Sequence, residues 1–372
     1  MIERKYMERA MELAKKGLGY TNPNPMVGAV IVKDGKIIGE GYHERCGELH
    51  AERNAIAHLT QDAKGATIYV TLEPCCHYGK TPPCTEAIIE KKISRVVIGS
   101  RDPNPLVAGK GVKQLRDAGI EVIEDFCRAE CDAMNEVFFH YITTKQPYVV
   151  MKYAMTADGK IATKTGDSKW ITGEKAREHV QYLRHRYMGI MVGIGTLLAD
   201  NPMLNCRIPN GRNPIRIICD SNLRIPIDCQ IVETAKEIPT IVAVKKQEFT
   251  KEQKEKKEQL IKKQVEIIEV PEKEKEINLT KLMKILGEKG IDSILLEGGG
   301  ILNDTALREE LVKKVYVYMA PKMFGGSQSK TPVEGEGVSL AKEAYSFSIE
   351  QIQKIGEDIV IEMKNEDNSK NL

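Results

Sequence analysis

The feature that most constrains this 372-residue chain is a set of His, Glu and Cys residues divided between two short segments. The segment HAERNA begins at His50 and contains Glu52, and the segment EPCCHYGKTPPC carries Cys75, Cys76 and a final Cys84. Two thiolates and one imidazole can hold Zn²⁺ in tetrahedral geometry and leave the fourth position to water. Water held in that way ionises near neutral pH. Any fold of this chain must therefore bring the two segments into one pocket.

The order of these residues predicts a role for each of them. We expect His50, Cys75 and Cys84 to bind the metal, and Glu52 to transfer protons without touching it. His and Glu two residues apart, followed by Cys residues after a Pro, are typical of zinc-dependent deaminases that act on bases. Because residues two apart do not face each other on a regular helix, we expect His50 at the very start of a helix. A second helix should follow Cys84, where the helix dipole favours a thiolate.

The spacing of the cysteines leaves an alternative ligand set open. The deaminase signature separates its two Cys by two residues, whereas here the second lies nine positions after the first, with a loop between them. Cys76 and His77 therefore compete with Cys75 for the metal. We favour Cys75, because it directly follows Pro74, and interpret His77 and Lys80 as loop residues that face the substrate. A single Cys is often only a core residue, but the combined pattern favours a metal site.

Length and composition describe an ordinary globular protein of two domains. Hydrophobic residues make up 41% and charged residues 29%, and a net charge of +2 gives no electrostatic reason to bind nucleic acid. Nine Cys are scattered over both halves, with no signal peptide and no apolar run long enough for a membrane span. We therefore expect a cytoplasmic protein with reduced thiols and no membrane partner.

Alternating strand and helix signals predict an α/β fold in both halves, with a boundary near Lys145. The domains are expected at 1–145 and 146–372, with a disordered tail after about residue 364. In the first half, two strands should flank an Asp34-Gly35 turn, and a sheet should carry helices on both faces. The expected elements, in chain order, lie at 7–14, 27–42, 50–59, 66–72, 85–92, 95–100, 111–119, 121–125, 148–155, 173–187, 189–195, 214–220, 240–244, 292–298 and 314–321. The charged run at 245–264 has mixed signs and is interpreted as a solvated helix face.

Two glycine-containing segments in the second half indicate a second site. The segment SILLEGGGILND at 293–304 predicts a strand that runs through three glycines into a helix, and VGIGTLLADNP at 192–202 also follows a strand. Glycines let the backbone approach an anion, and a helix N-terminus offers free amides to a phosphate. The spacing is not that of a GxGxxG loop, and one glycine cluster is often only a turn. Two such segments in one domain favour a nucleotide cofactor.

A longer series of motifs resembles a known family over nearly the full length of the chain. The motifs are NPNPMVGAVIV, HAERNA, EPCCHYGKTPPC, RDPNPLVAGKG, TADGKIAT, GDSKWIT, VGIGTLLADNPMLNCR, LEGGG and APKMFGG. They resemble the bifunctional deaminase-reductases of riboflavin biosynthesis. The resemblance implies an N-terminal cytidine-deaminase-like three-layer α/β/α domain and a C-terminal dihydrofolate-reductase-like α/β domain. Cys76 departs from the pattern, because many relatives have Ser there, and it adds a second oxidisable thiol beside the site.

The resemblance implies two reactions and two cofactors, Zn²⁺ and NADPH. The first reaction is hydrolytic deamination of 2,5-diamino-6-(5-phosphoribosylamino)pyrimidin-4(3H)-one. The second is reduction of its ribosyl group to ribityl, which gives 5-amino-6-(5-phosphoribitylamino)uracil. The partner is then a small phosphoribosyl-pyrimidine, and a homo-oligomer, dimer or tetramer, is expected. The alternatives are a nucleotide or tRNA deaminase with an inactive second domain, and a non-enzymatic module with structural zinc.

The same resemblance assigns further site residues. Positions that match deaminase substrate contacts are Asn24, His43, His77, Lys80, Asp102 and Asn104. Positions that match cofactor contacts are Ala154, Trp170, Thr172, Thr196, Asp200, Ser221, Gly299, Gly300 and Ile301. Positions that match reductase substrate contacts are Lys152, Ser168, Arg184, Leu204, Arg207 and Glu297.

Some of these reductase positions have an expected role. We expect Lys152 and Glu297 to lie nearest to the reacting sugar and to act as catalytic residues. Arg184 and Arg207 would form a phosphate clamp, because a guanidinium can bind an oxyanion through two parallel hydrogen bonds. Trp170, the single Trp, is predicted to contact the cofactor, although it could equally be a core anchor.

Overall fold

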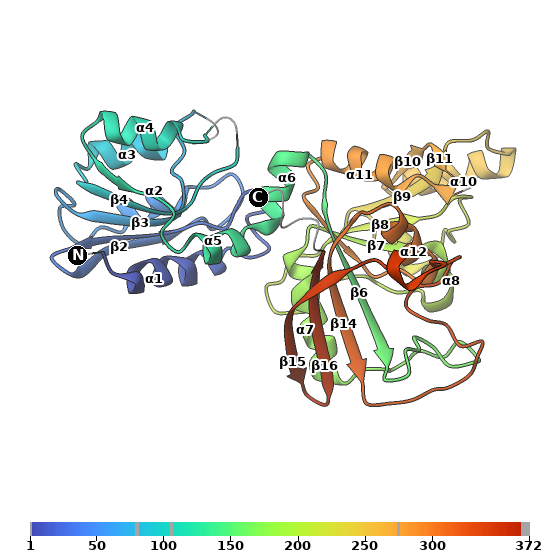
Figure 1. Ribbon diagram of the computed structural model, residues 1–372. Helices are drawn as coiled ribbons and strands as arrows, with labels where there is room; N and C mark the ends of the chain where they lie inside the picture. The colour runs from blue at the N-terminus through green and yellow to red at the C-terminus, as the bar shows by residue number, and fades with distance from the viewer. Residues whose placement is uncertain (1, 79–81, 105–106, 274–275, 366–372) are drawn as a thin grey trace. The chain divides into compact units, whose positions relative to one another are not determined.

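The computed structural model describes residues 2–78, 82–104, 107–273 and 276–365. The chain divides into two compact units, Met1–Lys145 and Gln146–Leu372, each with its own sheet (Figure 1). The predicted disordered tail falls outside the described residues from residue 366 onward. Within the described residues, none of the helices combines the length and the apolar character that a membrane crossing requires.

Unit 1 contains a five-stranded sheet in the order β2-β1-β3-β4-β5. β1 pairs antiparallel with β2 and with β3, whereas β3 with β4 and β4 with β5 are parallel. The strands are β1 (Gly28–Lys33), β2 (Lys36–Tyr42), β3 (Thr67–Leu72), β4 (Arg95–Ser100) and β5 (Glu121–Ile123). The helices are α1 (Arg4–Lys15), α2 (Ala51–Ala57), α3 (Cys84–Glu90), α4 (Lys110–Asp117), α5 (Arg128–Met134) and α6 (Glu136–Thr144).

Helices cover both faces of this sheet. Ile31 and Ile68 belong to a core that also contains residues of α2, α3 and α4. Val30 and Val97 point to the opposite face and pack with residues of α1 and α5. Neighbouring strand residues thus enter different cores, as the two-residue period of a strand requires. The predicted three-layer α/β/α arrangement of the first half is confirmed.

Local sequence signals account for the first elements of unit 1. Asp34 and Gly35 both have positive φ, 50° and 73°, which is the backbone that a two-residue hairpin turn needs between β1 and β2. The apolar repeat at Met7, Ala10 and Ala14 lies on the buried side of α1. Both features follow the predicted pattern.

Unit 2 contains a nine-stranded sheet in the order β10-β9-β8-β7-β13-β6-β14-β16-β15. The pairs from β10 to β14 are parallel, and β16 and β15 add an antiparallel hairpin at one edge. The strands are β6 (Tyr148–Thr156), β7 (Gly189–Gly193), β8 (Ile215–Cys219), β9 (Thr240–Lys245), β10 (Val265–Val270), β13 (Ser293–Leu296), β14 (Val312–Ala320), β15 (Phe347–Ile355) and β16 (Asp358–Asn365), with the short pair β11 (Glu272–Lys273) and β12 (Glu276–Ile277) apart. The helices are α7 (Glu174–Arg186), α8 (Ile194–Asp200), α9 (Gln230–Glu233), α10 (Lys251–Lys262), α11 (Leu279–Glu288), α12 (Gly300–Arg308) and a 3₁₀ turn η1 (Ala341–Glu343).

Helices also lie on both faces of the parallel part of this sheet. One core joins strand residues such as Ile217 and Ile294 to α11 and α12. The other core joins Ile190 and Val242 to α8, α9 and α10. The expected α/β fold of the second half is confirmed, and α10 is the solvated helix that the charged run at 245–264 predicted.

The hairpin β15–β16 and the strand β10 were not predicted. β15 is exposed along most of its length, including Ile349 and Ile352. Its alternation of apolar and polar residues stops at the register shift between Ile349 and Gln351, so it is too short to predict a half-buried strand. β15 and β16 are consecutive strands joined by a short turn, whereas the attachment of β16 to β14 depends on backbone hydrogen bonds between segments far apart in sequence.

A completely buried arginine holds the chain segments around β8 together. Arg216 has no exposed surface, and its guanidinium donates to the hydroxyls of Thr234 and Thr240 at 2.8–3.0 Å. It also donates to the carbonyls of Ile231 and Ile238 at 2.9 and 3.0 Å. Burial lowers the pKa of Arg216 to about 10. The side chain is therefore tied to several neutral oxygen atoms, of which the carbonyl of Ile238 also accepts a hydrogen bond from the Thr240 hydroxyl at 2.9 Å.

Arg216→Met should lower the free energy of unfolding of unit 2 by about 3–5 kcal/mol, because it removes the donor to several buried acceptors at once. Lys236→Met, an exposed position in the same region, should change it by less than about 0.5 kcal/mol. Urea denaturation followed by circular dichroism and by fluorescence of Trp170, which lies in unit 2, measures both variants. Equal stabilities of the two variants would contradict this role of Arg216.

Candidate functional site

Three side chains with metal-binding atoms meet in unit 1. His50 is the N-cap residue of α2, Cys84 is the first residue of α3, and Cys75 lies shortly after the end of β3. The Nδ1 atom of His50 is 3.4 Å from the Sγ atom of Cys75 and 3.4 Å from that of Cys84. All three donor atoms lie within 4.8 Å of one another. Two sulfur atoms and one ring nitrogen at this separation suit Zn²⁺.

Backbone contacts hold the two cysteines in place. The carbonyl of Cys75 accepts hydrogen bonds from the amides of Cys84 and Thr85, at 3.0 and 3.2 Å, and so pairs two free amides of the first turn of α3. Arg53 donates to the carbonyls of Pro82 and Pro83, at 3.0 and 2.7 Å, and so ties the end of the loop before Cys84 to α2. The last two residues before Cys84, Pro82 and Pro83, are therefore fixed beside α2.

A buried glutamate anchors the other side of the Cys75 segment. Glu73 is 4% exposed. Its carboxylate accepts hydrogen bonds from the amides of Gly109 and Val112 at the start of α4, at 3.1 and 3.2 Å. Gly111 on α4 has no room for a side chain, since a Cβ there would lie 2.3 Å from the carbonyl oxygen of Pro74. The close approach of α4 thus fixes the backbone just before Cys75, a contact that the sequence analysis did not foresee.

The two cysteines differ in acidity before any metal binds. The hydrogen bond from the Cys84 thiol lowers the pKa of Cys75 to about 4. The same hydrogen bond, together with burial, raises the pKa of Cys84. One sulfur is therefore already a thiolate, and the other must lose its proton when a metal binds, as in metal sites generally. Cys76 and His77 do not belong to this cluster of donor atoms, so the described geometry favours Cys75 over them.

Glu52 shares a cavity with the metal-binding residues but is not one of them. It is the second residue of α2, is 3% exposed, and lines a cavity of about 370 Å³ together with His50 and Cys75. Burial raises the pKa of Glu52 above its ordinary value. Glycines bring α2 close to the sheet, because a Cβ at Gly41 would lie 2.3 Å from the backbone nitrogen of Ala55.

The residues predicted to contact the deaminase substrate gather in the same cavity. The lining includes Asn24, His43, His77, Asp102 and Asn104. Asn24 Nδ2 is 3.1 Å from His43 Nε2, and the other ring nitrogen of His43 is 3.0 Å from the carbonyl oxygen of Leu49. Burial raises the pKa of Asp102 to about 7. The buried Nδ1 of His77 has no hydrogen-bond partner among the described residues.

One predicted residue of this cavity is not described by the structure, and one part of its wall was not predicted. Lys80, expected to meet the phosphate, lies outside the described residues. Phe138, Tyr141 and Ile142 of α6 form an apolar part of the wall that was not predicted. The segment VFFHYI gives only a helix signal, and its distance along the chain from His50 hides its place at the cavity.

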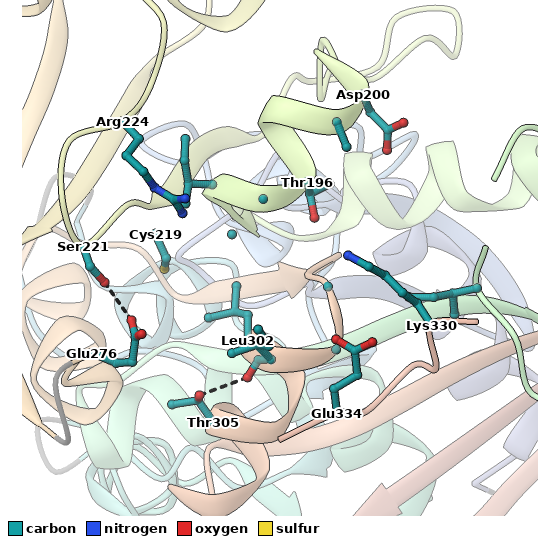
Figure 2. A pocket seen from close by; sticks show the side chains of 18 of the residues that line it. Thr196, Asp200, Cys219, Ser221, Arg224, Glu276, Leu302, Thr305, Lys330 and Glu334 are labelled. Carbon is teal, nitrogen blue, oxygen red and sulfur yellow. Dashed lines mark hydrogen bonds between the residues drawn. The ribbon is translucent and has the colours of Figure 1, made fainter. Parts of the chain in front are cut away.

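Unit 2 contains a second cavity, of about 440 Å³ (Figure 2). It lies where β7, β8 and β13 end, the edge at which open parallel sheets bind their ligands. Predicted cofactor and substrate residues in its lining are Ser168, Thr196, Asp200, Ser221, Gly299, Gly300 and Ile301. Gly299 is the N-cap residue of the nine-residue helix α12, so free backbone amides face this region. The wall also contains Arg224, Glu276, Lys330 and Glu334, which were not predicted.

Three other predicted cofactor residues, all within the described part of the chain, do not line this cavity: Ala154, Trp170 and Thr172. Trp170 is 63% exposed, and the guanidinium carbon of Arg177 lies 4.7 Å from its ring centroid. Trp170 is therefore not the core anchor that the sequence also allowed. Contact of these three residues with a cofactor stays a prediction.

The two predicted catalytic residues of unit 2 belong to a buried charge cluster. Arg184 on α7 donates to both carboxylate oxygens of Glu297 at 2.9 Å, and Lys152 Nζ lies 3.9 Å from Glu297 Oε2. The three side chains are only 11–14% exposed. Burial alone would raise the pKa of Glu297, but Arg184 and Lys152 lower it to about 2. Burial lowers the pKa of Lys152.

The contacts of this cluster involve one of the two arginines of the predicted phosphate clamp. The guanidinium of Arg184 donates to Glu297 and to the carbonyl of Asn205 at 3.2 Å, so three of its five N–H donors are already used within the protein. Arg207 contacts the side chain of Asn205 at 3.1 Å and remains exposed. Leu204 is 3% exposed and packs in the core, which leaves it little surface for a ligand.

Two family models match the chain. Residues 1–100 match the cytidine and deoxycytidylate deaminase zinc-binding region, and residues 147–361 match the RibD C-terminal domain. The chain is 55% identical to riboflavin biosynthesis protein RibD of Actinobacillus pleuropneumoniae over 97% of its own length and 95% of the relative's. It is 44% identical to RibD of Aquifex aeolicus over 98% of both chains.

Solved structures give the same result. A diaminohydroxyphosphoribosylaminopyrimidine deaminase/5-amino-6-(5-phosphoribosylamino)uracil reductase from Thermotoga maritima is 40% identical, with a TM-score of 0.85 over 97% of this chain and 98% of that one. A RibD structure from Acinetobacter baumannii is 36% identical, with a TM-score of 0.87 over the same shares. With its two domain matches in this order and relatives along its full length, the chain belongs to the RibD family of riboflavin biosynthesis proteins.

Proposed function

We propose that the chain catalyses two successive steps of riboflavin biosynthesis. Unit 1 deaminates 2,5-diamino-6-(5-phosphoribosylamino)pyrimidin-4(3H)-one, and unit 2 then reduces the ribosyl group with NADPH to give 5-amino-6-(5-phosphoribitylamino)uracil. The observation that carries the proposal is the cavity in which Glu52 lies beside the donor atoms of His50, Cys75 and Cys84. A ligand cavity in the unit that matches the RibD C-terminal domain supports the second step.

In unit 1, zinc held by His50, Cys75 and Cys84 would supply an activated water molecule at neutral pH. Glu52 takes a proton from the attacking water and passes it to a ring nitrogen. It then takes the proton of the newly added hydroxyl group and passes it to the departing amine, so that a carbonyl forms as ammonia leaves. Its buried position and raised pKa suit a carboxyl group that gains and loses a proton in each cycle. The amide of Asn24 and the ring of His43 hold the pyrimidine edge, and Lys80 binds the phosphate.

In unit 2, NADPH would supply a hydride for C1′ of the sugar in its ring-opened imine form, and the imine nitrogen would take up a proton to give the amine. We expect Lys152 and Glu297 to be the residues nearest to that carbon. Glu297 stays a carboxylate because two cations surround it, so it holds Lys152 in place and keeps a positive charge available to the developing amine. Arg184 fixes Glu297 by its paired hydrogen bonds.

The alternative of a deaminase with an inactive second domain receives less support. Unit 2 has a cavity at the carboxyl ends of its strands, and it matches the RibD C-terminal domain. A domain without catalytic activity would not need to keep such a cavity. A homo-oligomer and a cytoplasmic location stay predictions from the sequence.

Glu52→Gln should lower deaminase turnover roughly a hundredfold to ten-thousandfold, because the amide cannot transfer the proton. Zinc content should remain one ion per chain. Ammonia release from the diaminopyrimidine phosphate measures turnover, and elemental analysis measures the metal. Glu44→Gln, an exposed position on the loop before His50, is the matched control. Near-normal turnover of the Glu52 variant with bound zinc would overturn the assigned role.

Separate substitutions of Cys75 and Cys76 show which of the two cysteines binds the metal. Cys75→Ser should lose most of the bound zinc, because a thiolate with a depressed pKa is removed from the cluster. Cys76→Ser should retain the metal and most of the deaminase activity. Zinc per chain after dialysis against a weak chelator is the measurement. Loss of zinc from the Cys76 variant alone would assign the site to the other cysteine.

Lys152→Met should lower the rate of NADPH oxidation at least about tenfold and leave ammonia release unchanged, because only the buried cluster of unit 2 loses its lysine. The exposed Lys354→Met is the matched control. The two reactions are followed separately on the same preparation. Unchanged NADPH oxidation in the Lys152 variant would remove this residue from the mechanism.

A further inference from the structure

The pairing of β6 with β14 places two tyrosines beside Lys152. In this pairing Lys152 lies opposite Tyr316, and Ala154, two residues further along β6, lies opposite Tyr318. Residues two apart on a strand share one face of the sheet, so these four side chains lie on the same face. Lys152 and Tyr318 are thus diagonal neighbours across the two strands, and a long side chain can reach an aromatic ring over that distance.

The ammonium group of Lys152 lies over the ring of Tyr318. The Nζ atom is 5.5 Å from the ring centroid, within the range in which the negative face of an aromatic ring attracts a cation. Tyr318 is 1% exposed, and the lysine side chain is 14% exposed. This attraction is stronger in such a place, because the ammonium has already lost most of its hydration.

The contact with Glu297 does not by itself fix the position of Lys152. The Nζ atom is 3.9 Å from Glu297 Oε2, which is too long for a hydrogen bond. Both carboxylate oxygens of Glu297 already accept hydrogen bonds from Arg184 at 2.9 Å. The carboxylate therefore attracts the ammonium without directing it, and the ring of Tyr318 supplies a second direction of attraction.

His179 of α7 in turn fixes the ring of Tyr318. The Nδ1 atom of His179 is 2.7 Å from the hydroxyl oxygen of Tyr318, and this hydrogen bond links α7 to β14. Burial lowers the pKa of His179 and raises the pKa of Tyr318, so both rings are favoured in their neutral forms. The neutral pair places no second cation against Lys152, and its hydrogen bond opposes rotation of the phenol ring.

We propose that Tyr318 is a positioning residue of the reductase site: its ring face holds the ammonium group of Lys152 in one position, and His179 fixes that ring. The inference rests on the proposed role of Lys152 in the reduction. The imine nitrogen gains a proton as the hydride reaches C1′, so the reaction needs a charged lysine at a defined place. Tyr318 and His179 act through Lys152 and not on the substrate.

Removal of the ring separates this role from simple core packing. Tyr318→Met keeps apolar bulk without a ring face, so it should lower kcat for NADPH oxidation about tenfold and change the KM for the pyrimidine less than about twofold. Tyr318→Phe keeps the ring face and should retain more than about a third of kcat. Ammonia release by unit 1 should be unchanged in both variants. Tyr182→Leu, at an exposed position of α7, is the matched control.

The pKa of Lys152 gives a readout that requires neither substrate nor cofactor. An aromatic face favours the ammonium form, so its loss should lower this pKa in Tyr318→Met and not in Tyr318→Phe. An NMR titration of isotope-labelled lysine side chains measures the pKa, and Lys152→Met identifies the signal. The other titratable groups beside Lys152 are the same in both Tyr318 variants: Glu297 after β13, Arg184 of α7 and Tyr316 of β14.

Ring analogues test the same point without depending on the stability of Tyr318→Met. Phenylalanine analogues with increasing fluorine content, incorporated at position 318, keep nearly the same shape and lose electron density from the ring face. Both kcat and the pKa of Lys152 should fall stepwise along this series. Circular dichroism confirms that each variant is folded. A packing role alone predicts no such trend.

A double-mutant cycle tests the part of His179. His179→Leu and Tyr318→Phe remove the same hydrogen bond, so each should lower kcat about twofold to threefold, and the double variant should be no slower than the slower single variant. Losses that multiply in the double variant would show that the two residues act separately, which would remove His179 from the inference.

The outcomes distinguish the inference from the proposed function. If Lys152→Met slows NADPH oxidation but the fluorinated series leaves kcat unchanged, the role of Tyr318 is refuted and that of Lys152 stands. A lower pKa of Lys152 with unchanged kcat would also refute the positioning role. If Lys152→Met is fully active, or if the unaltered protein does not oxidise NADPH, the proposed role of Lys152 and the inference both fall.

Discussion

Parallel pairing of strands places the chemically active segments of both units at one edge of a sheet. Parallel strands end at the same side, and the chain must then turn into a helix or loop, so free amides and polar side chains collect there. In unit 1 the ends of β3 and β4 lead to Cys75 and Asp102. In unit 2 the ends of β7, β8 and β13 surround the larger cavity. Packed helices, close backbone contacts at glycines and buried polar side chains hold these strand ends in place.

Buried carboxyl groups in the two units have pKa values that are shifted in opposite directions. Burial raises the pKa of Glu52 and of Asp102, because it outweighs the opposing effects of the His50 ring on Glu52 and of the Asn104 amide on Asp102. Burial acts on Glu297 as well, but Arg184 and Lys152 outweigh it and lower the pKa. A carboxyl group that can carry a proton suits hydrolysis with an amine leaving group. A permanent carboxylate suits the positioning of cations beside a hydride acceptor.

Much of the fold follows from local sequence patterns. The helix at Met7–Ala14, the turn at Asp34-Gly35 and the strands of the parallel regions were predicted, because each has a period or a turn residue that no other structure satisfies well. The hairpin β15–β16 was missed, since its exposed edge strand has no such period. In the first site, His50, Cys75 and Cys84 were grouped correctly, whereas the α6 wall was not, because helix periodicity does not tell which cavity a helix adjoins.

The sequence by itself determined the kinds of chemistry that the chain can perform, because the residue types that bind zinc, transfer protons and approach phosphates are few and their order is distinctive. Only the tertiary structure decided which of these groups meet. It placed Cys75 rather than Cys76 beside His50, paired Arg184 with Glu297, and brought Arg224 to the cavity wall. Such pairings depend on distances between segments that are remote in sequence, and those distances are set by sheet order and helix packing.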